Sequence, residues 1–283
     1  MKTHETLTQK LVGAVLGLAL VATSAPAAAD PGHTVAELRR AIASGVPSAI
    51  VSQIEHGEFM FCASCIPDMM QLLDHPEYEV REAAAWWFAA RPAQMEEIAE
   101  RSLAYLQMND SIKARNAADA LGAFQLVRAI PALSAAIVRT DLDAEARVAI
   151  ARALGRIGHP DANPALAAAM KDPDPAVRRE AVTAWREIRG QTSAAPAVAL
   201  LADRDATVRR AAASLVGRFR QADARAELER LVASDADAAV RRNAAWALGR
   251  IGDPASRGVL EAALTDPSGL VRGVARVALS QLR

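Results

Sequence analysis

Cys62 and Cys65 are the only two cysteines among the 283 residues, and their spacing supports three kinds of chemistry. In an oxidising compartment, such a pair forms a local disulfide. At the start of a helix the pair favours thiol–disulfide exchange, because a helix N-terminus lowers the pKa of a thiol. Together with Met60 the pair offers soft ligands for Cu(I), and His56 and His75 would complete a zinc set. The sequence leaves the disulfide, redox and metal interpretations open.

The segment that must position the pair, residues 30–64, departs from the pattern of the rest of the chain. Thr34 and Glu37 form a capping box ahead of the apolar positions of a first short helix. A second short helix is predicted from Ser48 to Gly57, and a further helix opens at the Ile-Pro pair that follows Cys65. We therefore expect an N-terminal helical cap that shields the open end of the structure that follows.

Residues 65–283 contain one block that recurs at spacings of 31 to 33 residues. Its first residue, called position 0 below, falls at Val80, Lys113, Ala146, Val177, Val208, Val240 and Val271. Apolar residues at positions 0, +4, +5, +8 and +11 have the spacing of one buried helical stripe. Each block is therefore predicted to be the second helix of a helical pair. The first helices are predicted in segments that begin at Ile130, Asn163 and Arg257.

Polar residues repeat with the same period. A short oxygen-bearing side chain stands at position −3, where it can cap the second helix, in Asp143, Asp174, Asp205, Asp237 and Ser268. Arginine recurs at +1 (Arg81, Arg147, Arg178, Arg209, Arg241, Arg272) and aspartate at −5 (Asp141, Asp172, Asp203, Asp235, Asp266). Because a catalytic pair is needed once and these pairs recur, we interpret them as structural ion pairs between turns.

The pattern DPxxxVRxxAxxALGxIGD, as in residues 235–254, resembles the short HEAT repeats first named from phycobilin lyases. This resemblance implies an all-α, right-handed α-solenoid of about seven helical-hairpin repeats. It is weak for activity, because the family includes scaffolds, lyases and a di-iron hydroxylase. The hydroxylase branch uses His-Glu pairs on several repeats, whereas the only such pair here is His4-Glu5. A di-iron site of that kind is therefore not expected.

The second helices of such repeats line the concave side, so positions +2, +6 and +10 should face a partner. These positions are Arg115, Arg179, Arg210 and Arg242 at +2, Trp86 and Trp246 at +6, and Arg156, Arg218 and Arg250 at +10. Arginine with exposed tryptophan is the composition of a recognition surface. We therefore predict that these residues bind an acidic protein segment.

Residues 1–29 have the pattern of a secretory signal peptide, with Lys2 and Lys10 ahead of an apolar stretch and three alanines before Asp30. We expect a mature chain that starts at Asp30, in the periplasm or secreted. Residues 30–110 carry 5 basic and 13 acidic side chains, and residues 111–283 carry 26 and 19. Over residues 30–283 together the chain carries 31 basic and 32 acidic side chains, and this near balance, with export, argues against nucleic acid as the partner.

No Ser-His-Asp order, Gly-rich phosphate loop or HExxH motif is present. The sequence therefore predicts a non-enzymatic, cofactor-free binding or assembly scaffold without a membrane span after cleavage. The alternative is a periplasmic thiol-redox or metal-handling protein that uses Cys62 and Cys65, with Met60 as a further metal ligand.

Overall fold

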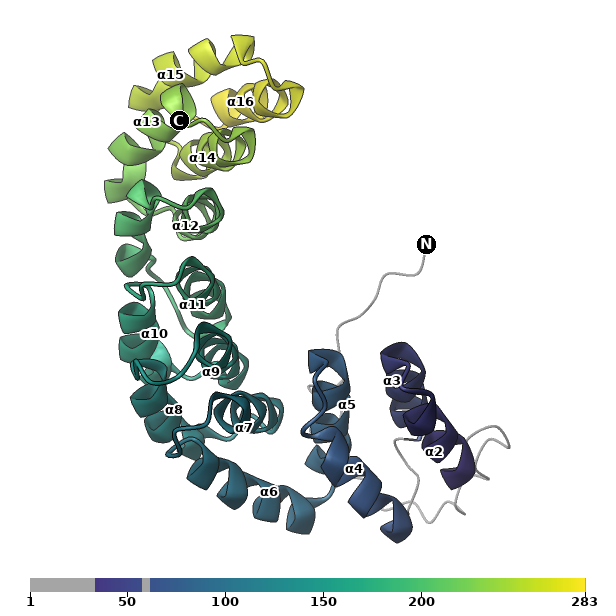
Figure 1. Cartoon of the computed structure of the whole chain (residues 1–283). Helices are drawn as coiled ribbons and strands as arrows, with labels where there is room; N and C mark the ends of the chain where they lie inside the picture. The colour runs from purple at the N-terminus through teal and green to yellow at the C-terminus, as the bar shows by residue number, and fades with distance from the viewer. Residues whose placement is uncertain (1–33, 58–61, 283) are drawn as a thin grey trace, which may run out of the picture.

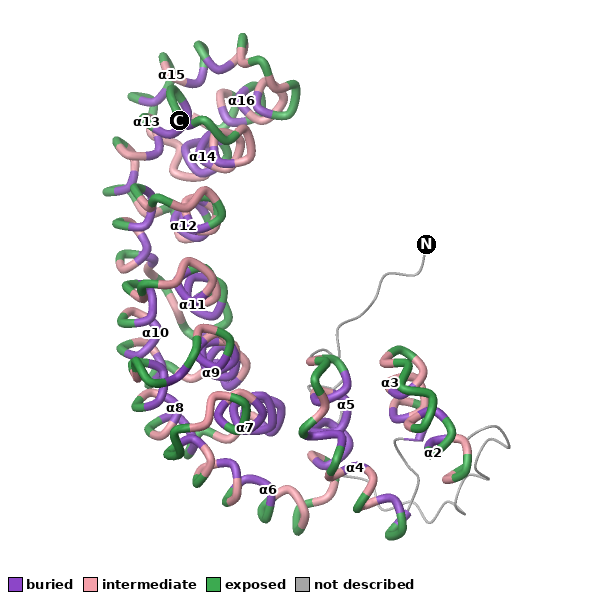
Figure 2. Tube along the Cα trace, viewed as in Figure 1, coloured by how far each residue is buried: buried purple, intermediate pink, exposed green. Residues whose placement is uncertain are grey.

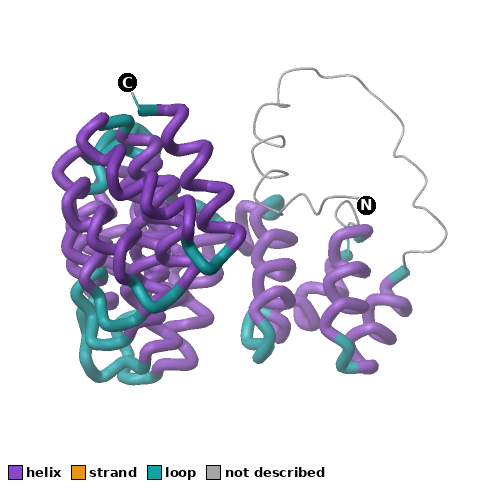
Figure 3. The backbone as a smooth tube through the Cα atoms, turned by 90° about the horizontal axis from the view of Figure 1, so that it is seen from above, coloured by secondary structure: helices purple, strands orange, loops and turns teal. Residues whose placement is uncertain are grey.

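The computed structural model describes residues 34–57 and 62–282, and every regular element in these ranges is helical (Figure 3). The all-α solenoid predicted from the repeat is confirmed. The expected signal peptide and Met60 lie outside the described residues. No helix in the described ranges is long and apolar enough to span a membrane.

The second helices form the inner layer of an arc, as Figure 1 shows. They are α5 (Tyr78–Ala89), α7 (Ser111–Ala123), α9 (Ala144–Ile157), α11 (Pro175–Glu187), α12 (Ala206–Arg218), α14 (Ala238–Ile251) and α16 (Gly269–Gln281). Each begins two residues before position 0 of its block, so the seven predicted second helices are confirmed.

The first helices form the outer layer of the arc. They are α4 (Ile66–Leu72), α6 (Pro92–Tyr105), α8 (Ile130–Ile137), α10 (Asn163–Ala169), α13 (Arg225–Ser234) and α15 (Arg257–Ala262). Ile130, Asn163 and Arg257 begin their helices as predicted. One outer segment differs from the others, because residues Ala195–Ala202 form a long 3-10 helix, η4, in place of an α-helix.

Aspartates cap the inner helices. The side chains of Asp143, Asp174, Asp205 and Asp237 accept backbone N–H groups of α9, α11, α12 and α14, as position −3 predicted. The prediction for Ser268 was wrong, since its side chain makes no cap hydrogen bond to α16. A capping carboxylate also faces the positive end of the helix dipole, which a serine hydroxyl does not exploit.

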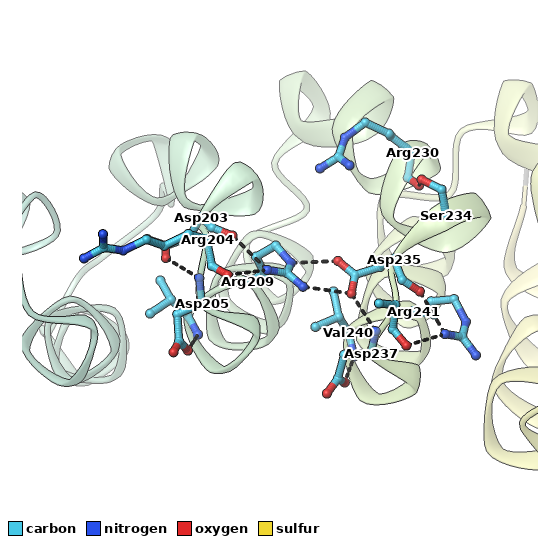
Figure 4. A network of polar contacts seen from close by, with 12 residues as sticks. Asp203, Arg204, Asp205, Arg209, Arg230, Ser234, Asp235, Asp237, Val240 and Arg241 are labelled. Carbon is cyan, nitrogen blue, oxygen red and sulfur yellow. Dashed lines mark hydrogen bonds and ion pairs between the residues drawn. The ribbon is translucent and has the colours of Figure 1, made fainter.

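In four repeats the arginine at +1 joins its repeat to the next one, as Figure 4 shows for Arg209 and Asp235. The Nε and Nη2 atoms of Arg178 donate to both carboxylate oxygens of Asp203 in the following repeat, at 2.7 and 2.8 Å. Its Nη1 donates to the backbone carbonyls of Asp172 and Pro173 in its own turn. The two-pronged pairing recurs in Arg147–Asp172, Arg209–Asp235 and Arg241–Asp266. Nη1 binds two turn carbonyls in Arg209 and Arg241 and one, that of Leu142, in Arg147.

The predicted ion pairs between turns are thus confirmed in these four repeats, and we call this series the ladder. The first expected pairs, at Arg81 and Asp141, differ from the others. Arg81 donates instead to Asp119, on the inner helix of the next repeat. Asp141 is bound by Arg139 two residues before it and takes no part in the ladder. The register of the first repeats therefore differs from that of the later ones.

Helices α2 (Val35–Ser44) and α3 (Pro47–His56) form the predicted N-terminal cap. The capping box of Thr34 and Glu37 is present, and α3 ends at Gly57. Helix α3 packs against α5 (Figure 1). Trp87 and Phe88 of α5 are buried, as expected of core residues.

The pKa values of two ladder carboxylates, Asp203 and Asp266, are lower in the fold than the ordinary value of an aspartate. Burial alone would raise the pKa of Asp203, but the hydrogen bonds from Arg178 and from the Asp205 amide hold that pKa below its ordinary value of 3.8. The hydrogen bond from Arg241 lowers the pKa of Asp266 in the same way. Because the folded pKa is depressed, these groups stabilise the fold above the unfolded pKa. That contribution is lost as the pH falls through the folded pKa.

We expect Asp203→Asn to lower the free energy of unfolding at pH 7 by about 2 kcal/mol, because it leaves the Arg178 charge buried without its carboxylate. The deficit should shrink as the pH falls from 3.8, the ordinary value that the unfolded chain takes, towards the lower pKa of Asp203 in the fold. Urea unfolding followed by circular dichroism over a pH series measures this difference. The control is Asp161→Asn, whose side chain is 72% exposed and should change stability little. Equal deficits in the two variants would contradict a structural role for the ladder.

Candidate functional site

The cysteine pair lies at the junction of the cap and the first repeat. Cys62 precedes the short 3-10 helix η1 (Ala63–Cys65), and α4 follows directly. The two sulfur atoms lie 2.07 Å apart. Cys65 is completely buried and Cys62 is almost so, within the hydrophobic core. The pair is therefore enclosed by packing and is not presented to a substrate.

The two histidines considered as zinc ligands have local partners. Nδ1 of His75 accepts the backbone N–H of Glu77 at 3.1 Å, and Nδ1 of His56 lies 2.6 Å from the carbonyl oxygen of Ser52. Within the described residues, no group of three or more His, Cys, Asp or Glu side chains is placed to hold a metal ion. The described residues therefore do not bring His56, His75, Cys62 and Cys65 together as a zinc site.

The N-terminal part of the predicted recognition surface is occupied by intramolecular contacts. Trp86 was expected to be exposed, and this prediction was wrong, because the residue is only 7% exposed on α5, the inner helix against which the cap helix α3 packs. Arg115 is half-buried and donates to Glu145. Arg156 reaches back to α5, where it pairs with Glu82 and donates to the hydroxyl of Tyr78 at 2.8 Å. These three residues serve the packing of the first repeats.

Tyr78 shows how thoroughly this corner is enclosed. Burial raises the pKa of Tyr78 to about 12, despite the opposing influence of Arg156. The guanidinium of Arg152 lies over the tyrosine ring, 3.9 Å from its centroid, and also donates to Asp119. Burial likewise raises the pKa of Glu180 on α11. The inner face between α5 and α9 is therefore a sealed polar core.

The C-terminal part of the predicted surface is open. Arg179, Arg210 and Arg218 are exposed, and within the described residues their side chains make no hydrogen bond or ion pair. The charge of Arg179 partly opposes the rise that burial causes in the pKa of Glu180. Arg242 is half-buried and bends onto the side-chain oxygen of Asn243. Trp246 is 39% exposed. The structure thus brings part of the predicted set together on α11, α12 and α14.

A cleft of about 530 Å³ opens on this face; of the predicted residues, Arg218, Arg250 and Trp246 line it, whereas Arg179, Arg210 and Arg242 do not. We call it the inner cleft; its lining includes Val182, Arg186, Leu215, Arg218, Trp246 and Arg250. The Nε atom of Arg250 is buried there without a hydrogen-bond partner in the described structure. Arginine donors beside an indole ring suit a carboxylate that lies next to an apolar group.

A change in side-chain size explains why the cleft opens at this point. At four other junctions a glycine at +9 faces an alanine at +7 of the next inner helix, as Gly217 faces Ala247. A Cβ added at Gly217 would come within 2.7 Å of that alanine's Cα, so these helices touch closely. Between α11 and α12 the same two positions hold Arg186 and Leu215. These helices pack less extensively than the other neighbouring pairs from α7 to α16.

The sequence interpretation missed Arg186 and Leu215, although both line the inner cleft. The signal was present as an arginine at a position where Gly122, Gly155, Gly217 and Gly249 occur in other blocks. The 3-10 helix η4 interrupts the outer layer in the same repeat as α12. The cleft therefore coincides with an irregular repeat.

Comparison with known proteins supports the repeat assignment. A family model described as HEAT repeats matches residues 135–212 and 194–280, and one described as PBS lyase HEAT-like repeat matches residues 113–138. No curated protein matches the sequence at a significant level.

Several solved structures are similar in fold. The X-ray structure of YibA from Escherichia coli is 16% identical, covers 99% of each chain and has a TM-score of 0.59. An engineered protein is 22% identical over 87% of this chain and 77% of its own, with a TM-score of 0.50. Human deoxyhypusine hydroxylase is 19% identical over 87% of this chain and 97% of its own, with a TM-score of 0.38. At these identities the likeness concerns the fold alone.

We predict that Cys62 and Cys65 form a stable disulfide, because the pair is buried and local in sequence. Without reductant, the purified protein should have an intact mass lower by two hydrogen atoms and should take up no iodoacetamide even in urea. Replacing both residues by serine should lower the free energy of unfolding by about 2 kcal/mol or less, since the closed loop is short. Rapid alkylation of the folded protein without reductant would instead indicate accessible, working thiols.

Proposed function

The chain belongs to the HEAT-repeat family, and we propose that it is a protein-interaction scaffold that holds an acidic segment of its partner on the concave face. HEAT and armadillo-like solenoids commonly serve protein binding. The observation that carries the proposal is the set of exposed arginines Arg179, Arg210 and Arg218 beside the inner cleft. No carboxylate of the described chain makes a hydrogen bond or ion pair with these three side chains, and only Arg179 has an acidic neighbour, Glu180, with which it interacts electrostatically.

The charge of this face favours an acidic partner. In the ladder, each buried arginine pairs with an aspartate of the next repeat. The exposed arginines Arg210 and Arg218 on the concave face have no such carboxylate in the described chain and so depart from that pattern. Exposed arginine remains charged at every physiological pH and binds carboxylates through two parallel hydrogen bonds. An acidic segment along α11, α12 and α14 would complete these contacts.

The proposal assigns no catalytic step to this face. The described residues that line the inner cleft are cationic, hydroxyl, amide and apolar, and none is a carboxylate or imidazole. Such a set can bind and orient a carboxylate but lacks a general base. The enclosed cysteine pair is assigned to fixing the turn that leads into α4, not to redox or metal chemistry.

We further propose that the protein acts outside the cytoplasm after cleavage before Asp30. The support is the signal-like pattern of residues 1–29 and the cysteine pair, which suits an oxidising compartment.

A photo-cross-linking residue placed at Thr183 tests the binding face in the native host. Thr183 is exposed on α11 and lines the inner cleft, so we expect it to yield a discrete cross-linked product. The same residue at Ala226, which is exposed on the outer helix α13, should not. Adding Arg179→Glu and Arg210→Glu should cut the Thr183 product roughly tenfold, because reversed charges repel an acidic segment.

The matched control reverses Arg257 and Arg276, two exposed arginines that do not line the inner cleft. This control should retain the cross-linked product, and all variants should keep the wild-type melting temperature. Equal products from Thr183 and Ala226, or an unchanged product after the inner reversal, would contradict the proposed face.

The intact mass of the protein purified from its host tests export. We expect a chain that starts at Asp30, because the alanines before it suit signal-peptide cleavage. N-terminal sequencing gives the same answer independently. A mature chain that retains Met1 would contradict cleavage.

A further inference from the structure

An apolar groove adjoins the inner cleft at its C-terminal end. The groove has a volume of about 330 Å³ and is lined by Trp246 of α14 together with Leu270, Gly273, Val274 and Val277 of α16. Leu270 is 68% exposed and Val277 is 57% exposed. Trp246 and Gln281 line both the apolar groove and the inner cleft, so the two depressions are continuous.

In the last inner helix, α16, the positions +2 and +10 that hold arginine in other repeats hold neutral residues. Position +2 holds Gly273, where other repeats carry Arg179, Arg210 and Arg242. Position +10 holds Gln281 in place of arginine. With Val277 at +6, the concave face changes from cationic on α12 to apolar on α16. Trp246 lies at the boundary between the two characters.

The apolar residues are not placed to receive another stacked repeat. Position +5 is buried in earlier inner helices, as in Ala213 and Ala245, and lies one turn before the +9 glycine that touches the next inner helix. In α16 the same position holds the exposed Arg276. Stacking a further inner helix would bury this charge, which is costly without a carboxylate partner. Leu270 and Val277 therefore have no packing role toward a neighbouring repeat, and their groove opens along the concave face beside Trp246.

We propose that the occupant of this composite site is a linear peptide segment of a partner protein in which an apolar side chain stands next to acidic residues. The apolar side chain lies in the groove against Trp246, Leu270 and Val277. The acidic residues lie in the inner cleft, where Arg218 and Arg250 receive them. This inference rests on the proposed function and specifies the sequence chemistry of the partner.

The apolar groove and the cationic inner cleft lie side by side, so one peptide can match the first by apolar contact and the second by charge. Buried apolar contact supplies the free energy of binding, whereas the carboxylate contacts fix the position and direction of the peptide. Tryptophan and arginine are the residues that most often dominate such interfaces. A purely acidic ligand would leave the groove exposed to water, and a purely apolar one would leave Arg218 and Arg250 without partners.

Selection from a random dodecapeptide library displayed on phage, against the immobilised full-length mature protein, tests the inference. We expect enriched peptides that combine an aromatic or large aliphatic residue with neighbouring aspartate or glutamate. For a synthetic peptide of the enriched sequence, Val277→Glu should weaken binding about 30-fold, the loss typical of a central contact residue. Arg218→Glu should weaken it to a similar extent.

Val138→Glu is the matched control, because Val138 is 58% exposed but lies at the end of the outer helix α8. It should leave the affinity unchanged, and each variant should keep the wild-type thermal transition. Trp246→Phe should retain part of the affinity and Trp246→Ala should lose it, which separates a contact role from a folding defect.

Enrichment of peptides without the combined pattern, absence of any enriched class, or equal binding of wild type and Val277→Glu would overturn the inference. The proposed function fails separately. If Thr183 cross-links a partner that Val277→Glu still captures, the concave scaffold stands and the apolar anchor is excluded. If Thr183 yields no specific product, the scaffold proposal itself fails.

Discussion

The structure depends on one interaction, the arginine at +1 that binds its own turn and the next repeat together. A guanidinium presents donors on two edges, so Arg178 satisfies two turn carbonyls with Nη1 and chelates Asp203 with Nε and Nη2. The same side chain therefore satisfies buried backbone acceptors and sets the distance to the following repeat. Because four successive rungs share this geometry, the inner helices stack in register. Positions such as +2, +6 and +10 then form rows along the concave face.

Function is expected where this regular frame is interrupted. Close contact of glycine with alanine along the inner helices leaves no space for a ligand. Arg186 and Leu215 replace that pair at a single junction among α7 to α16, and the inner cleft opens there. The interruption weakens packing between α11 and α12 without removing the rung Arg178–Asp203. At this junction the Arg178–Asp203 pair thus keeps the two repeats together, while Arg186 and Leu215 leave the inner cleft between α11 and α12.

The fold was predictable because each local signal agreed with the others. Spacing of apolar residues, aspartate caps and the arginine ladder all placed the inner helices within the same ranges, and Ser268 was a minor exception. The site was less predictable, because a row position does not reveal its neighbours. Trp86 shares position +6 with Trp246, yet the former is 7% exposed and the latter 39%, and of their two helices only α5, which carries Trp86, packs against the cap helix α3. Contacts of that kind depend on where the cap docks, and the repeat pattern does not encode this docking.

Arginines at the same position therefore differ in role according to the carboxylates nearby. Arg156 and Arg218 both stand at +10 of an inner helix. Arg156 meets Glu82 and Tyr78 because α5 lies across from it, and its charge is used within the fold. No residue of the described chain makes such a hydrogen bond or ion pair with the side chain of Arg218, which is exposed and lines the inner cleft together with Trp246. An arginine row acquires a binding role only where the fold supplies no acid of its own. In this chain that condition holds on α12 for Arg210 and Arg218, whereas Arg186 of α11 pairs with Glu187, and it ends where α16 turns apolar.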